Sequence, residues 1–354
     1  MPIIEFSDRG LYCPIGGFYI DPWKPVDKAI ITHAHSDHAR PGSKHYLCHK
    51  DSEPLLRLRL GDISVDSLGW NDPISINGVT VSLHPAGHII GSAQVRLEYK
   101  GEIWVFSGDY KTEDDDISQP FEPVRCNVFI SESTLGLPIY HWKNQETIYR
   151  DIGRWIMQSH ESGKVPVLIG YSLGKAQRLL TCAANFTGKI FVHGAIWNVQ
   201  ETLNANGFHF PKVTRVTPEQ TKDIYRGGLI LAPPSADGTP WMRRFSPYSV
   251  ATCSGWMQVR GNARRRNTDA SFALSDHADW NGLISAVEAT GASQVYVTHG
   301  FQSAFSRYLN DKGIMAGEVV TEYGGEEEEK EKPTIDPAQE DEMKPTSPEN
   351  EETI

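Results

Sequence analysis

Ile30-Ile31-Thr32-His33-Ala34-His35-Ser36-Asp37-His38 is the stretch that decides how this chain is interpreted. Its three histidines and one aspartate fall within six residues, directly after an apolar run that predicts a buried strand. Imidazole and carboxylate are ligands that zinc and similar divalent ions accept. A lone histidine on an apolar face is more often a packed core residue. Four polar side chains this close would each need a separate partner if buried, so the stretch predicts a metal site.

Length and composition describe an ordinary globular chain. The 354 residues are 39% hydrophobic, the mean hydropathy is −0.41, and no apolar run approaches the ~18 to 20 residues of a membrane span. The N-terminus lacks the basic and apolar regions of a secretory signal. The five cysteines are odd in number and form no CxxC pair, which favours reduced thiols. We therefore expect no membrane association and a cytoplasmic location.

The net charge of −11 is unevenly distributed along the chain. Residues 326–354 contain 12 acidic and 3 basic side chains, so this segment carries −9 and the remainder carries −2. Residues 324–354 are rich in Glu, Lys and Pro and lack apolar periodicity, which predicts a disordered acidic tail. A nearly neutral body leaves a polyanionic substrate open.

Turn signals and apolar periodicity predict the main elements. Asn77-Gly78 and Lys100-Gly101 each predict a hairpin between short alternating strands. Helical spacing covers residues 145–162 and is followed by strands that alternate with helices, which predicts a parallel α/β unit over about 136–266. The predicted strands of this unit are 165–169, 190–192 and 229–231. The pattern of the first part then returns, with a strand at 294–297.

Side chains suited to metal binding recur where predicted strands end. They are His33, His35, Asp37, His38, His88, Asp109 and His299. Five imidazoles and two carboxylates are too many for one tetrahedral ion. They suit two ions about 3.5 to 4 Å apart that share a carboxylate and a hydroxide. His88 or Asp109 alone would be read as a turn residue, but together with the cluster they predict a dinuclear centre.

Short motifs around these residues carry a family resemblance. His33-x-His35-x-Asp37-His38, His88 in Ala-Gly-His-Ile-Ile-Gly-Ser and Asp109 in Ser-Gly-Asp-Tyr resemble the metallo-β-lactamase superfamily. Three later motifs resemble its β-CASP nuclease group: Glu132 in Ser-Glu-Ser-Thr-Leu-Gly, His277 in Ser-Asp-His-Ala-Asp and His299 in Val-Thr-His-Gly. Residues 11–22 are similar to bacterial ligase-associated DNA exonucleases, which are often described as mRNA 3′-end processing factors. The resemblance covers about residues 10–320.

The resemblance implies a fold and its domain organisation. We expect an α/β protein, a metallo-β-lactamase αββα sandwich with an inserted β-CASP α/β domain. Residues 1–135 and 267–323 would form the sandwich, 136–266 the inserted domain and 324–354 the acidic tail.

The resemblance also implies the arrangement of the metal ligands. His33, His35 and His88 would hold the first ion. Asp37, His38 and His299 would hold the second, and Asp109 would bridge the two. The implied cofactors are two divalent ions, Zn²⁺ and/or Mn²⁺. Animal Artemis-like DNA nucleases commonly lack the last histidine, so its presence here weakens a DNA-only substrate.

The remaining implied roles concern catalysis. Asp27 would orient ligands from outside the coordination sphere. Asp37 would act in catalysis as well as in metal binding. Glu132 and His277 would assist the leaving group, because a histidine held by a carboxylate can donate a proton. The alternatives are a solvated loop carboxylate for Glu132 and a residue of a helix N-terminus for His277.

Two stretches predict nucleic-acid contacts. Residues 170–175 join a strand to a helix, where Ser172, Gly174 and Lys175 can meet a phosphate. A plain connecting loop has the same pattern. The segment between residues 238 and 268 has no acidic residue and interleaves arginines with aromatics, as single-strand binders do, although a solvated face remains the alternative. Its predicted contacts are Arg243, Arg244, Arg260 and Arg264.

These inferences predict a metal-dependent nuclease in which hydroxide held by two metal ions hydrolyses phosphodiester bonds. A DNA exonuclease in DNA repair is the preferred form, with DNA ligase and helicase as partners that the resemblance suggests. The first alternative is an RNA-processing ribonuclease of the same fold. A small-molecule hydrolase (a lactonase, thioesterase or β-lactamase) should lack the inserted domain. A non-catalytic nucleic-acid-binding scaffold should have broken metal ligands.

Overall fold

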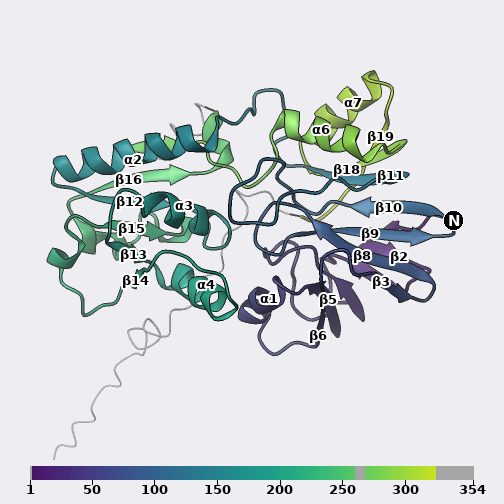
Figure 1. The fold of residues 1–354 in the computed structure, drawn as a ribbon, viewed down its shortest axis with the longest axis horizontal. Coiled ribbons are helices and arrows are strands. Elements are labelled where there is room, and N and C mark those ends of the chain that lie inside the picture. The colour runs from purple at the N-terminus through teal and green to yellow at the C-terminus, as the bar shows by residue number, and fades with distance from the viewer. Residues whose placement is uncertain (1, 260–267, 324–354) are drawn as a thin grey trace, which may run out of the picture.

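Three β-sheets and their helices make up the part of the chain that this computed structural model describes, residues 2–259 and 268–323. Two of the sheets lie on the right of Figure 1 and the third lies on the left. The mixed α/β class expected from the sequence is therefore confirmed. The predicted acidic tail lies outside the described residues.

The first sheet has six strands that stand side by side in chain order. They are β1 (Glu5–Ser7), β2 (Gly10–Cys13), β3 (Phe18–Ile20), β4 (Lys28–Ile30), β5 (His45–His49) and β6 (Val65–Leu68). β1, β2 and β3 pair antiparallel, whereas β3, β4, β5 and β6 pair in parallel. The chain leaves β4 at Ile30 and enters the irregular segment that holds the histidine cluster.

The second sheet has seven strands in the order β19–β18–β11–β10–β9–β8–β7. They are β7 (Ile74–Ile76), β8 (Val79–Pro85), β9 (Ala93–Tyr99), β10 (Glu102–Phe106), β11 (Val128–Ser133), β18 (Gln294–Gly300) and β19 (Met315–Glu318). Both predicted hairpins are present. Asn77 and Gly78 adopt φ values of 50° and 86°, and Lys100 and Gly101 adopt 52° and 82°, as a two-residue turn between twisted strands requires.

One apolar core lies between these two sheets. Leu11 and Ile20 of the first sheet share it with Val81, Val95 and Phe106 of the second. Each sheet thus buries one face against the other, and burial of apolar area is the main stabilising term in folding.

Helices cover the outer faces of the paired sheets. α1 (Glu53–Leu60) packs Leu55 on the first sheet. α6 (Trp280–Thr290) and α7 (Gln302–Asp311) pack Leu283 and Phe305 against Phe129 of the second sheet. Figure 1 shows α6 and α7 above the second sheet and α1 beside β5 of the first sheet.

The third sheet is entirely parallel, with the order β14–β13–β15–β12–β16–β17. Its strands are β12 (Val165–Ile169), β13 (Ile190–Val192), β14 (Thr214–Arg215), β15 (Leu229–Ala232), β16 (Tyr248–Cys253) and β17 (Ala270–Phe272). Its helices are α2 (Gln145–Glu161), α3 (Lys175–Ala183) and α4 (Gly194–Ala205), and four 3₁₀ turns follow: η1 (Lys222–Tyr225), η2 (Pro234–Ala236), η3 (Pro240–Phe245) and η4 (Gly255–Gln258). Ile152 of α2 and Leu180 of α3 bury against Leu168 on one face.

The parallel α/β unit is interposed between β11 and β18, which pair with each other in the second sheet. β17 joins the third sheet beyond residue 266, where the sequence places the end of this unit. The domain boundaries themselves remain a prediction.

Candidate metal centre

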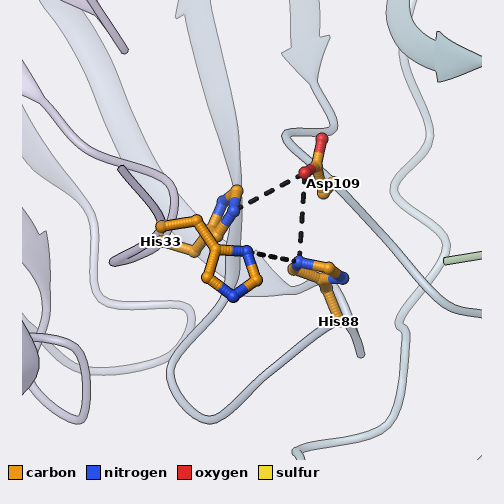
Figure 2. A group of neighbouring side chains, drawn as sticks. His33, His88 and Asp109 are labelled. Atoms are coloured by element: carbon orange, nitrogen blue, oxygen red, sulfur yellow. Dashed lines mark hydrogen bonds and ion pairs between the residues drawn. The ribbon is translucent and has the colours of Figure 1, made fainter. Parts of the chain in front are cut away.

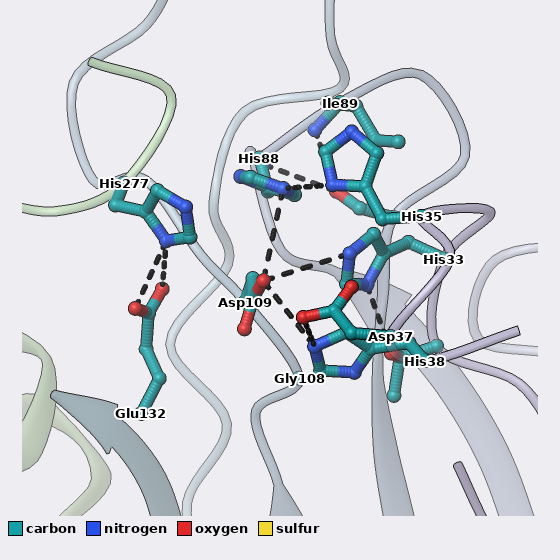
Figure 3. A network of polar contacts seen from close by, with 12 residues as sticks. His33, His35, Asp37, His38, His88, Ile89, Gly108, Asp109, Glu132 and His277 are labelled. Carbon is teal, nitrogen blue, oxygen red and sulfur yellow. Dashed lines mark hydrogen bonds and ion pairs between the residues drawn. The ribbon is translucent and has the colours of Figure 1, made fainter. Parts of the chain in front are cut away.

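The predicted histidine cluster lies in the segment that follows β4. His33 and His38 are fully buried, whereas His35 and Asp37 are partly exposed. Figure 3 shows these four side chains stacked on one side of Asp109, with His277 and Glu132 on the other. A strand end therefore delivers four polar groups to one space, as its sequence predicts.

Asp109 stands at the centre of this space, just after β10. Its Oδ2 lies 3.6 Å from His33 Nε2, 3.4 Å from His38 Nε2 and 3.9 Å from His88 Nε2. Its Oδ1 lies 3.1 Å from His299 Nε2. Figure 2 shows His33 and His88 converging on the same carboxylate.

Ligand atoms within 4.8 Å of one another form two main sets that share Asp109. The first ligand set is His33, His35, His88 and Asp109, and the second ligand set is His38, Asp109 and His299. A further group, His33, Asp37 and His38, places Asp37 beside the second set. All seven predicted ligands are thus brought together.

The histidines of both sets are held by their outer ring nitrogens. The partners are Thr32 Oγ1 for His33 (3.0 Å), the Leu173 carbonyl for His35 (3.3 Å), Asp21 Oδ2 for His38 (2.7 Å), the Asp276 carbonyl for His88 (2.7 Å) and Thr298 Oγ1 for His299 (3.2 Å). Such bonds fix the orientation of metal-binding imidazoles. Among the described residues, Nε2 of His33 and of His38 are buried without a hydrogen-bond partner. Buried polar atoms rarely stay unsatisfied, so the donor set fits a divalent metal.

The carboxylate that supports the cluster is Asp21, and the prediction of Asp27 for this role is wrong. Asp27 forms an exposed ion pair with Lys44, with Oδ1 2.8 Å from Nζ, and its side chain is 78% exposed. Asp21 is fully buried and accepts from the backbone N–H of Thr32 at 2.8 Å as well as from His38. Asp21 directly follows β3, so the adjacent parallel strand, not the strand of the cluster, supplies the carboxylate.

Burial and neighbouring charges shift the pKa values of the ligands in different directions. Burial lowers the pKa of His33 and of His88 well below the usual value, and neighbouring imidazoles add to this. Burial also lowers the pKa of His38, but the carboxylates of Asp109 and Asp37 outweigh it and raise that pKa well above the usual value. Burial raises the pKa of Asp109, and His38 and His299 outweigh it and lower it well below the usual value. The carboxylate at the centre is therefore held ionised.

Glu132 and His277 form a buried pair on the far side of Asp109. His277 Nδ1 lies 2.9 Å from Glu132 Oε2, and Glu132 Oε1 accepts from the backbone N–H of Tyr110 at 2.7 Å. Glu132 lies inside β11, so it is not a solvated loop residue. The cap of α6 is Asp279, which accepts from an N–H of that helix, so His277 is not the cap. The structure therefore brings the two predicted residues together beside the ligand sets.

The predicted phosphate-binding groups at the start of α3 are buried or already hydrogen-bonded within the protein. Lys175 is fully buried, and its Nζ lies 2.9 Å from Asp276 Oδ2, so the prediction that its ammonium contacts a nucleic-acid phosphate is wrong. The N–H of Gly174 donates to Gln177 Oε1 at 2.8 Å, which occupies that amide. Ser172 is 6% exposed, and its hydroxyl is buried. The junction lies beside the metal centre, because the Leu173 carbonyl is 3.3 Å from His35 Nε2.

Two of the predicted arginine contacts lie on η3, between β15 and β16 of the third sheet. Arg243 is exposed on η3, and its role remains a prediction. The Arg244 guanidinium lies over Trp241 at 5.8 Å and donates to the Trp241 carbonyl at 3.1 Å, so it is engaged within η3. Arg260 and Arg264 lie outside the described residues.

Three residues near the ligands escaped the sequence analysis. They are Asp21, Asp276 and Tyr323. Tyr323 is buried and stacks on His38, with ring centroids 4.6 Å apart and planes 10° apart. A tyrosine just before an acidic tail gives no signal in a single sequence. Asp276 stands next to His277 in a quoted motif, and Asp21 ends the stretch 11–22.

Among the described helices, none combines the length and the apolar character needed to cross a membrane.

Comparisons with known proteins give relatives that act on nucleic acids. No family model matches the chain. A probable DNA ligase from Opitutus terrae is 32% identical over 321 residues, which cover 88% of this chain and 30% of that protein. RNase aCSPSF2 from Saccharolobus solfataricus is 26% identical over 39% of this chain and 28% of the relative. An RNase J-like protein from Methanocaldococcus jannaschii is 26% identical over 47% of this chain and 46% of the relative.

The matches therefore span less than half the length of each of these relatives. A crystal structure of a protein of unknown function from Enterococcus faecalis V583 has a TM-score of 0.58 at 11% identity, covering 84% of this chain and 80% of that one. At this identity the likeness shows a shared fold alone. The relatives confirm the resemblance to the metallo-β-lactamase superfamily and its β-CASP nuclease group.

Proposed function

We propose that this protein is a metal-dependent nuclease that hydrolyses phosphodiester bonds, and specifically a DNA exonuclease acting in DNA repair. One observation carries the proposal: two ligand sets share Asp109 beside the buried His277–Glu132 pair. Phosphodiester hydrolysis needs positive charge at the phosphate and a proton for the leaving oxygen. The two ligand sets could hold the positive charge, and the His277–Glu132 pair could supply the proton.

The ligand sets would hold the cofactors. His33, His35 and His88 would bind one ion, and His38, Asp37 and His299 the other. Asp109 would bridge them. When bound, two divalent ions, which we take to be Zn²⁺ and/or Mn²⁺, would supply Lewis acidity and lower the pKa of water at the site.

The proton for the leaving oxygen would come from His277. Its Nδ1 is fixed on Glu132, so Nε2 is the atom that would donate. Both residues are buried, which keeps their geometry constant between turnovers. General acid catalysis of this kind contributes about 10²- to 10⁴-fold to a rate.

The preference for DNA has a narrower basis. A relative that matches 88% of this chain is named a probable DNA ligase, which supports a DNA substrate and functional association with a ligase. The archaeal relatives named as RNases match smaller shares and support the alternative, a ribonuclease. A helicase partner remains an expectation.

The proposal also assigns the three sheets to domains and the protein to a cellular compartment. The paired sheets with helices outside them would be the αββα sandwich. The third sheet would be the inserted β-CASP domain, predicted at 136–266 and extended here by β17. The five cysteines are free thiols, which supports a reducing compartment, and we take the cytoplasm as that compartment.

The deciding assay offers matched single- and double-stranded DNA and RNA, labelled at either end, with Mn²⁺, Mg²⁺ or Zn²⁺. We expect cleavage of DNA, with products that shorten from one end. Cleavage of a lactone or thioester with no cleavage of any polynucleotide would refute the nuclease proposal. Cleavage of RNA alone would agree with the proposed phosphodiester hydrolysis but refute DNA as the substrate.

Glu132→Gln tests the proposed proton donor. We expect a rate loss of about 10²- to 10⁴-fold with metal content unchanged, because Gln keeps the shape but no longer stabilises a protonated imidazole. Glu102→Gln is the matched control, an exposed carboxylate on the neighbouring strand β10, and it should leave the rate unchanged. Equal rates in the two variants would remove Glu132 and His277 from the mechanism.

A further inference from the structure

A buried cluster of charges joins the start of α3 to the segment that carries His277. Lys175 Nζ lies 2.9 Å from Asp276 Oδ2, and an Arg178 guanidinium nitrogen lies 2.6 Å from Asp276 Oδ1. All three residues are at most 3% exposed. We call Lys175, Arg178 and Asp276 the Asp276 clamp.

The Arg178 guanidinium has further partners in this cluster. Arg178 also donates to the Ser275 carbonyl and to Gln145 Oε1, the latter at 2.7 Å, and lies 3.8 Å from Asp115. Burial raises the pKa of Asp276, but the charges of Lys175 and Arg178 outweigh it and hold that pKa well below the usual value. Buried ion pairs contribute little net stability compared with apolar packing, and in some proteins they specify geometry instead.

The position of the clamp gives that role. The backbone carbonyl of Asp276 accepts from His88 Nδ1 at 2.7 Å, across 188 residues of sequence. The clamp fixes the side chain of the residue whose carbonyl orients this imidazole. The bond sets the tautomer of His88 so that Nε2 faces Asp109.

The loop before α3 makes a second contact of the same kind. The Leu173 carbonyl accepts from His35 Nε2 at 3.3 Å, which leaves His35 Nδ1 facing His88, 3.0 Å away. Gly174 permits this approach, because a Cβ there would lie 2.3 Å from Ile89 Cγ2. The partners of His38 and His299, by contrast, are Asp21 and Thr298, which belong to the paired sheets.

We propose that Lys175 and Arg178 are positioning residues through which the third-sheet domain sets the metal affinity of the first ligand set, while the second ligand set is independent of them. The proposal rests on the metal centre proposed above. It implies that the first ligand set binds its metal ion tightly only when the third-sheet domain, the unit built on the third sheet, packs against the paired sheets.

The test measures metal binding and the tautomer of His88 separately. Zn²⁺ affinities come from competition with a chelator for the full chain, the Lys175→Met variant and the Asp276→Asn variant. Neither variant removes the backbone carbonyl that holds His88, so the loss is limited to the misplacement of that carbonyl. We expect one of the two sites to weaken in both variants by up to about 10- to 100-fold, the loss that follows when the partner of a metal-binding histidine is itself removed, and the other site to keep its affinity. Leu180→Ala is the control, because it loosens the same helix in the core of the third sheet and does not belong to the clamp.

Nitrogen NMR of the metal-free protein with labelled histidine supplies a readout that needs no metal. We expect His88 to hold its proton on Nδ1 in the native chain and in Leu180→Ala, and to show mixed tautomers in Lys175→Met. Equal weakening of both sites, or unchanged affinities and an unchanged tautomer, would overturn the clamp. If the native chain bound no metal, the proposed function would be refuted. The NMR measurement would still test the clamp in that case, because an unchanged His88 tautomer in Lys175→Met would refute it.

Discussion

Asp21→Asn tests a residue that supports the metal centre without being one of its proposed ligands. Asp21 is fully buried and accepts three bonds: from Thr32 N at 2.8 Å, from Thr32 Oγ1 at 2.5 Å and from His38 Nδ1 at 2.7 Å. Its φ of 41° lies in the left-handed region, which asparagine tolerates better than most residues. The substitution therefore changes charge and acceptor capacity with little change of backbone or volume.

The expected loss follows from these three bonds. Hydrogen bonds to charged groups contribute about 1.5 to 3 kcal/mol, and neutral ones about 0.5 to 1.5 kcal/mol. Asparagine has one acceptor oxygen and presents an amide where the second carboxylate oxygen was. We expect the free energy of unfolding of the metal-free protein to fall by about 3 kcal/mol. The metal affinity of the second ligand set should fall about 10- to 100-fold, because His38 loses its orienting partner.

Asp27→Asn is the matched control, because it is the same substitution six residues along the chain on an exposed carboxylate. Urea denaturation gives the stability, and chelator competition gives the affinities. Asp27→Asn should behave as the native chain in both. If Asp21→Asn also matched the native chain, or if it weakened the first ligand set alone, the assignment of Asp21 to His38 would be refuted.

Three further predictions address the centre, the core and the tail. Asp109→Asn should abolish cleavage while nucleic-acid binding largely survives, measured by gel shift beside the cleavage assay; equal loss of both would indicate a folding defect. The metal-free protein should lose stability as the pH falls from 6.5 to about 4, because burial lowers the pKa of His49 to about 4 and the unfolded chain takes up the proton first. His49→Phe should remove about 3 kcal/mol of that pH dependence in denaturation curves, and an unchanged curve would contradict the assignment. Removing residues 325–354 should leave nuclease activity intact or raise it, since the tail is acidic; an inactive truncated enzyme would count against the predicted disorder.

Local sequence signals were sufficient for the elements and for the candidate ligands. Asn77-Gly78 and Lys100-Gly101 specify their hairpins because each places two residues at positive φ. His88 and Asp109 could be assigned because each follows a strand closely, and strand ends converge when the strands share a sheet. Such information is carried within a few neighbouring residues.

The supporting contacts could not be found in this way. Asp21 and His38 are 17 residues apart, and the pair between Arg178 and Asp276 spans 98 residues. Lys175 looked like a phosphate ligand because its neighbours resemble a helix N-terminus, and only the packing of α3 against residues 275–276 shows that its charge is already neutralised. Burial, rather than residue type, decides whether a lysine meets solvent or an aspartate.

The pairing of β11 with β18 has a consequence for how the protein is made. Ile130 lies beside Tyr296 in parallel register, and the whole third sheet is synthesised between them. Pairing over so long a loop is slow, because chain entropy is lost before the contact is gained. His277 and His299 both emerge after that loop, so a ribosome-bound chain holds His33 to His38, His88 and Asp109 long before the centre can be completed. Completion of the proposed centre therefore requires translation through β18, which carries His299.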